Sequence, residues 1–203
     1  MRLALTVLLL VLHPALGMGQ HQPWTRGWGV AFGGDGTRFG AIARDAAAPA
    51  EAAADLRPSA RTGFRAGVTH GFGAWRAQLE VGWAQGEAEA GNESVAVRDK
   101  TLDLSRYRVA PAVEARITGV GAGELAVALT PTLDLWRAGG STRTRLGVEG
   151  RLALRVSLGR VALENRLAIG ISGSPLDQED LGAGFEMNEL RWLAFGVGVW
   201  LPL

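Results

Sequence analysis

Apolar and polar residues alternate with a period of two from about Trp75 to the C-terminus, and charged residues fall on only one parity. Near the start of this region, Trp75, Leu79 and Val81 alternate with Arg76 and Glu80. A period of two gives each segment the two faces of a β-strand, one apolar and one charged. Because such runs repeat and are joined by very short turns, they predict a closed antiparallel barrel whose apolar face contacts lipid.

The alternation divides the chain into eight predicted strands, each close to or longer than the ~9–11 residues that a tilted membrane strand needs. The fold class is therefore all-β, an antiparallel eight-stranded up-and-down transmembrane β-barrel. The predicted strands are 24–32, 61–70, 73–84, 102–117, 124–137, 142–158, 161–172 and 189–202.

Short and long connections alternate along the chain, which is typical of outer-membrane barrels. Gly71-Phe72 and Gly159-Arg160 are two-residue loops with glycine first, as in type II′ hairpins, and a third short turn lies around Gly119 to Gly123. An even number of strands places both termini on the periplasmic side and the long loops outside. The long loops are 33–60, 85–101 and 173–188, with a brief connection near Gly139-Gly140.

These turns also predict which polar residues face one another inside the barrel, because a hairpin turn sets the register of its two strands. In a narrow eight-stranded barrel such residues form paired, side-chain-filled contacts. The expected lumen pairs are Arg155 with Glu164, Arg108 with Asp134, and Arg65 with Gln78.

Aromatic residues cluster toward the strand ends, as in the two interfacial girdles of a membrane barrel. Trp24, Trp75 and Trp200 are expected toward the short turns, and Trp83 toward the long loops. A soluble β-sandwich or lipocalin would also alternate, with its apolar set facing inward. The girdles and the mixed charges of the polar face favour the membrane barrel.

The N-terminus has the pattern of a secretory signal peptide at residues 1–17, followed by a barrel domain at 18–203. Arg2 precedes an apolar stretch that is too short to span a bilayer, and small residues suit cleavage after Gly17, or after Gly19. The chain has no cysteine, which excludes a disulfide framework. Its formal net charge of +1 gives no reason to expect a nucleic-acid partner.

With these features the chain resembles the OmpA/OmpX-type small outer-membrane barrels over nearly all of its mature length. The segment from Phe195 to Leu203 is similar to the C-terminal assembly signal of that superfamily. The last residue of that signal is typically aromatic, whereas in this chain it is Leu203. The resemblance implies an integral protein of the bacterial outer membrane, a monomer. Its implied partners are outer-membrane lipid, lipopolysaccharide and, through the C-terminal strand, the assembly machinery.

No catalytic or metal site can be assembled from the sequence. Barrels that modify lipid A use a histidine near the outer leaflet, whereas His13 is in the signal peptide and His21 and His70 fall on the periplasmic side. Clustered ligands for a metal are missing as well, and we expect no cofactor. The sequence thus favours a non-catalytic structural or surface-interaction protein. A lipid A-modifying enzyme and a small channel are the alternatives.

Overall fold

The computed structural model describes residues 26–46, 53–91, 96–120, 123–181 and 184–203. No helix in this part of the chain has the length and apolar character needed to cross a membrane.

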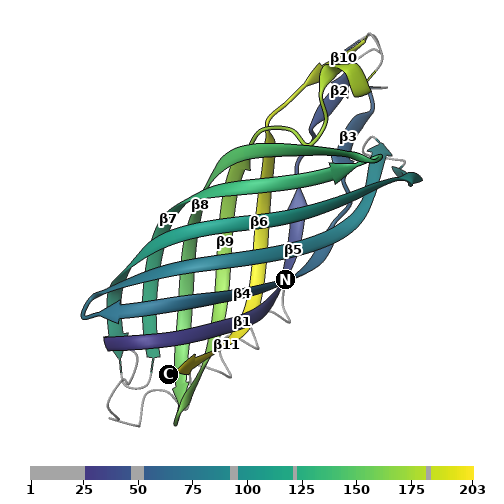
Figure 1. Ribbon diagram of the computed structural model, residues 1–203. Coiled ribbons are helices and arrows are strands. Elements are labelled where there is room, and N and C mark those ends of the chain that lie inside the picture. Colours follow the sequence, from purple (N-terminus) through teal and green to yellow (C-terminus); the bar gives the residue numbers. More distant parts are fainter. Residues whose placement is uncertain (1–25, 47–52, 92–95, 121–122, 182–183) are drawn as a thin grey trace.

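Eight long antiparallel strands form a closed barrel, as predicted (Figure 1). Each strand is hydrogen-bonded to two neighbours, and the β5–β6 pairing closes the sheet. The strands are β1 (Arg26–Phe39), β4 (Arg61–Phe72), β5 (Trp75–Gly91), β6 (Ala96–Val120), β7 (Gly123–Ala138), β8 (Ser141–Leu158), β9 (Val161–Ser172) and β11 (Leu190–Pro202).

The two faces of the barrel wall follow the predicted parity. On the outside, Val81 is 52% exposed and Val199 is 38% exposed. The charged parity faces the interior, where Arg76 and Arg155 are 4% and 2% exposed. A soluble protein with its apolar residues inside would show the reverse, so the alternation is confirmed as that of a barrel with an apolar outer surface.

Three short strands extend the barrel at one end, the loop end, where they project beyond the wall in Figure 1. They are β2 (Ala43–Asp45), β3 (Asp55–Pro58) and β10 (Phe185–Met187), and β3 pairs with the end of β5. The prediction of plain loops at 33–60, 85–101 and 173–188 is therefore wrong in part. Outside the lipid layer neither face of the sheet has to be apolar. The strands there continue to pair, but their sequence lacks the alternation of apolar and polar residues by which the other strands were predicted.

Tight hairpins close the opposite end of the barrel, the turn end. Gly159-Arg160 joins β8 to β9 as predicted, with Leu158 opposite Val161 and Gly159 at φ +70°. The turn between β4 and β5, however, is Gly73-Ala74 rather than Gly71-Phe72, because Gly73 takes the positive φ of +83°. This choice pairs Phe72 with Trp75, so β4 ends two residues after its predicted end and β5 begins two residues after its predicted start. The predicted cross-strand pairs of this hairpin are shifted by four residues, which leaves every side chain on its predicted face.

Candidate functional site in the barrel lumen

The barrel interior is filled by ion pairs, most of which are linked to one another through shared side chains. Among the described residues, seven buried arginines and seven buried carboxylates are paired with one another there, so the formal charges of these ion pairs balance, whereas an eighth buried arginine, Arg61, donates to the backbone carbonyl oxygens of Leu104 and Glu87. The paired residues are Arg65, Arg76, Arg106, Arg108, Arg151, Arg155 and Arg166, with Asp35, Glu80, Glu114, Glu124, Asp134, Glu149 and Glu164.

At the turn end, the lumen is closed by Trp200. Its indole Nε1 donates a 2.8 Å hydrogen bond to Oγ1 of Thr69, and the guanidinium of Arg76 lies 5.7 Å from the ring centroid. Trp200 is only 2% exposed. The prediction of an interfacial Trp200 is therefore wrong. In β11 the outward residues are odd-numbered, such as Phe195 and Val197, and Trp200 is on the inward parity.

Arg155 is the central cation of the next group of contacts. Its Nε donates to Glu164 Oε2 at 2.7 Å, and its Nη1 donates to Glu124 Oε1 at 3.1 Å. The Nη2 atom donates to both oxygens of Glu114, at 2.7 and 2.9 Å. The structure thus places Arg155 directly opposite Glu164 and in contact with it. One arginine with three carboxylates cannot be neutral alone, and Arg76 compensates by pairing with Glu114 and Glu124.

The predicted contact of Arg65 with Gln78 is wrong. The shifted hairpin places Arg65 opposite Gly82, and Arg65 instead donates to Asp35 at 3.1 Å and to Glu164 at 2.9 Å. Asp35 was missed from the sequence because it lies in a glycine-rich segment assigned to a loop. The signal was present, since Asp35 continues the inward parity of β1.

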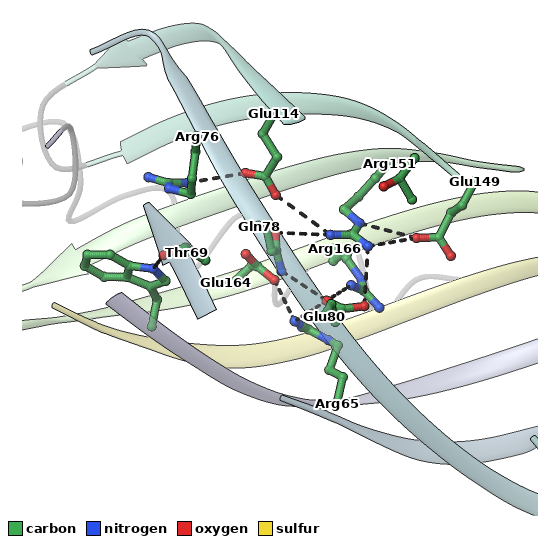
Figure 2. A network of polar contacts seen from close by, with 12 residues as sticks. Arg65, Thr69, Arg76, Gln78, Glu80, Glu114, Glu149, Arg151, Glu164 and Arg166 are labelled. Atoms are coloured by element: carbon green, nitrogen blue, oxygen red, sulfur yellow. Dashed lines mark hydrogen bonds and ion pairs between the residues drawn. The ribbon is translucent and has the colours of Figure 1, made fainter. Parts of the chain in front are cut away.

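Glu80 lies at the middle of the network (Figure 2). It accepts hydrogen bonds from Arg166 at 2.7 Å, Arg108 at 2.8 Å and Arg151 at 3.4 Å, and from the amide of Gln78 at 3.2 Å. These donors come from four different strands of the wall. The carboxylate of Glu80 thus connects distant strands through a single acceptor group. Glu80 is only 1% exposed, and the arginines around it compensate its buried negative charge.

Arg108 lies opposite Asp134 in the β6–β7 register, as predicted, but it does not form the ion pair of that carboxylate. Arg106, two residues away on the same face, binds Asp134 through two hydrogen bonds of 3.0 and 2.7 Å. Arg108 reaches across the lumen to Glu149 and Glu80. An arginine side chain is long enough to bypass its neighbour, so register alone does not decide its partner.

An apolar cluster closes the lumen above this network, at the loop end. The guanidinium of Arg106 lies 4.3 Å from the ring centroid of Trp192 and 5.5 Å from that of Trp136, which combines ion pairing with cation–π contact. Ile42 and Leu176, from segments beyond the barrel wall, are buried in the same cluster. The remaining members are Phe39, Ala88, Leu104, Ala138, Ala168, Leu190 and Ala194.

Little free space is left among these side chains. A hollow bounded by Asp35, Arg106, Arg108 and Arg166 has a volume of about 30 Å³, which is room for about one water molecule. An eight-stranded barrel is just wide enough for side chains to fill it. The geometry is that of a solid polar core and not that of a wide aqueous pore.

The aromatic residues of the outer surface lie near both ends of the wall. Trp75 and Trp83 point outward, 52% and 39% exposed. His70 lies on the same surface beside Trp28, with ring centroids 4.7 Å apart. Trp24 and the predicted signal-peptide cleavage site lie outside the described residues.

Two acidic residues beyond the barrel wall, Asp177 and Asp180, are paired with arginines. Asp177 accepts hydrogen bonds from Arg143, at 2.7 Å, and from Arg145, and Asp180 accepts one from Arg143 at 2.8 Å. The hydrogen bond from Arg143 lowers the pKa of Asp177. The described residues contain no group of three or more His, Cys, Asp or Glu that could hold a metal ion.

Comparisons with known proteins agree with this geometry at the level of the fold. No protein-family model matches the chain, and no curated protein is significantly similar to it in sequence. Among solved structures it is similar to the outer membrane protein OprG from Pseudomonas aeruginosa, with a TM-score of 0.60 and 10% identity over 91% of this chain and 99% of the other. It is also similar to Neisserial surface protein A, with a TM-score of 0.58 and 10% identity over 87% and 97%. The chain therefore has the OmpA/OmpX-type architecture of the small eight-stranded outer-membrane β-barrels.

Proposed function

We propose that this protein is a non-catalytic integral barrel of the bacterial outer membrane, with a structural or surface-interaction role. The likeness to two small outer-membrane barrels supports the location. The apolar outer face supports membrane insertion, because a soluble protein rarely exposes so large an apolar surface. In this proposal the loop end, with β2, β3 and β10, faces the outside, and the turn end and both termini face the periplasm.

The observation that carries the proposal is that the lumen is blocked at two levels, in its middle and at the loop end. Seven arginines and seven carboxylates fill its middle, and the cluster around Trp136 and Trp192 covers the loop end. Partner molecules can therefore contact the loops and the outer wall of this protein, but they cannot enter its filled lumen.

Planar-bilayer recording tests this proposal against the small-channel alternative. The purified protein should give no stable conductance steps, because ions would have to displace buried ion pairs. A porin added to the same bilayer is the positive control. A persistent open pore with reproducible unitary conductance would contradict a sealed lumen.

The lipid A-modifying alternative is tested by mass spectrometry of lipid A from cells with and without the gene. We expect identical acylation patterns. His70, which an acyl-transfer or hydrolytic mechanism would need, lies on the outer wall at the turn end beside Trp28 and Phe72. A mass shift that depends on the gene would refute the non-catalytic assignment.

Orientation and assembly can be tested on cells. An epitope inserted within 47–52, between β2 and β3, should be labelled on intact cells, and one between Gly159 and Arg160 should not. The reverse labelling would place His70 at the outer leaflet and reopen the enzyme question. We also propose that β11 engages the assembly machinery. We propose in addition that the barrel is a monomer, because β11 is paired on both edges, with β9 and β1.

A further inference from the structure

Two arginines on the outer wall of the barrel lie at the loop end without an acidic partner. Arg38 in β1 and Arg191 in β11 are both exposed and are outside the lumen network. Among the described residues, neither forms an ion pair or a side-chain hydrogen bond. Arg38 is opposite Leu193 in the register, so Arg191 is its diagonal neighbour. Side chains in that relation are on the order of 7–8 Å apart, close enough to contact one anionic group.

Their height on the wall matches the edge of the apolar band. On β1, Arg38 is ten residues beyond Trp28, which lies in the aromatic group at the turn end. At about 3.3 Å per residue and a tilt near 40°, ten residues rise roughly 25 Å along the barrel axis, about the height of the apolar band of such barrels. Arg38 is therefore at the level where lipid head groups meet acyl chains.

Below the two arginines the outer wall is hollowed. A groove of about 650 Å³ is bordered by Arg38, by Arg191 and by Arg57, which is paired with Glu89, and it is otherwise lined largely by apolar side chains, among them Val148, Ile169 and Leu193. A second groove of about 410 Å³ shares Arg38 and Leu193 with the first and is also lined by Gly36, Leu167 and Phe195. A third, of about 830 Å³, lies farther along β1, between Phe32, Phe64 and Val197, and includes Gly34.

Two glycines on the outward face of β1 leave the wall hollow there. A Cβ at Gly34 would approach no atom closer than 3.5 Å, and one at Gly36 none closer than 3.9 Å. By contrast, a Cβ at the inward-facing Gly33 would come within 2.5 Å of the carbonyl oxygen of Val197. Crowding thus accounts for Gly33 but not for Gly34 or Gly36, where a larger side chain would fit into the grooves.

We propose that Arg38 and Arg191, with the grooves below them, bind the phosphorylated and acylated lipid A part of lipopolysaccharide. The arginines would hold a phosphate through charge-assisted hydrogen bonds, and acyl chains would lie in the grooves. Three grooves suit a lipid with several acyl chains better than a phospholipid with two. This inference rests on the outer-membrane placement and orientation proposed above, because lipopolysaccharide forms the outer leaflet.

Native mass spectrometry of the full-length protein in detergent micelles tests the site. The probes are bisphosphorylated hexa-acyl lipid A, the same lipid without phosphates, and phosphatidylglycerol. We expect a one-to-one adduct with the bisphosphorylated lipid, weakened at least about tenfold without phosphates or in Arg38→Gln/Arg191→Gln. Gly34→Leu/Gly36→Leu should weaken it severalfold by filling the grooves.

Arg137→Gln is the matched control. Arg137 is an exposed, outward arginine at the loop end of β7, four strands from β1 in either direction around the barrel. Its substitution should leave lipid A binding unchanged within twofold, and the heat-dependent gel mobility should show that every variant is folded. Unchanged binding in both double variants, equal loss in Arg137→Gln, or equal affinity for phosphatidylglycerol would overturn the proposal. Because micelles have no sidedness, a wrong orientation would appear only in the cell-labelling experiment.

Discussion

Substituting Arg155 or Glu164 tests whether the lumen network stabilises the barrel. Arg155 binds three carboxylates at 2.7–3.1 Å, and both it and Glu164 are almost fully buried. Arg155→Met keeps most of the side-chain length but leaves seven carboxylates with six arginines. Removing one partner of a buried ion pair costs about 3–5 kcal/mol, because the remaining charge has lost its compensation.

Glu164→Gln perturbs the same contact from the other side. The amide keeps the shape of the carboxylate, but the 2.7 Å bond from Arg155 and the 2.9 Å bond from Arg65 lose their anionic acceptor. We expect a cost near 3 kcal/mol, at the lower end of the range, since Arg65 retains Asp35. In the double variant the lumen charges balance again, so its cost should fall below the sum of the single costs by about 1–3 kcal/mol.

The free energy of unfolding is measured by urea titration of the protein in phosphatidylcholine vesicles, followed by the fluorescence of its seven tryptophans. Arg145→Met is the control, since Arg145 pairs with Asp177, whose side chain is 52% exposed, and such surface pairs contribute about 0–1 kcal/mol. Single costs no larger than that of the control, or strict additivity in the double variant, would refute the view that Arg155 and Glu164 form a buried, interacting pair.

Three further predictions concern other parts of the chain. Trp200→Phe removes the 2.8 Å hydrogen bond to Thr69 and should cost about 1–2 kcal/mol in the same titration; an unchanged midpoint would mean that the bond contributes nothing. The pKa of Asp177 lies below its ordinary 3.8 because Arg143 donates a hydrogen bond to it, so the contact stabilises the loop above pH 3.8 and is lost as pH falls through the lowered pKa. A carboxyl ¹³C titration should show that pKa rising in Arg143→Gln, and equal values in both proteins would contradict the cause. Gly73→Ala should destabilise the barrel by about 1–2 kcal/mol, since Gly73 has φ +83°, and a change below 0.3 kcal/mol would count against a strained turn.

The alternation along the chain and the local turns determined much of this protein. A period of two follows from the geometry of a single strand, so the inward face of Arg76 and the outward face of Val81 required no knowledge of the neighbours. The contact of Arg155 with Glu164 could also be predicted from the sequence, because it depends on local geometry. Only a two-residue turn, Gly159-Arg160, separates their strands, and the register propagates from it.

Tertiary structure decided what lies between distant strands or beyond the membrane band. Arg65 in β4 meets Glu164 in β9 across two intervening strands, and Asp134 binds Arg106 although Arg108 is opposite to it in the register. Such partners depend on barrel closure and on long side chains that can reach several carboxylates. The extension formed by β2, β3 and β10 escaped detection because backbone hydrogen bonds alone sustain strand pairing where no lipid imposes an apolar face. Sequence periodicity thus records which face meets lipid, whereas the partners within the lumen are set by the closed barrel.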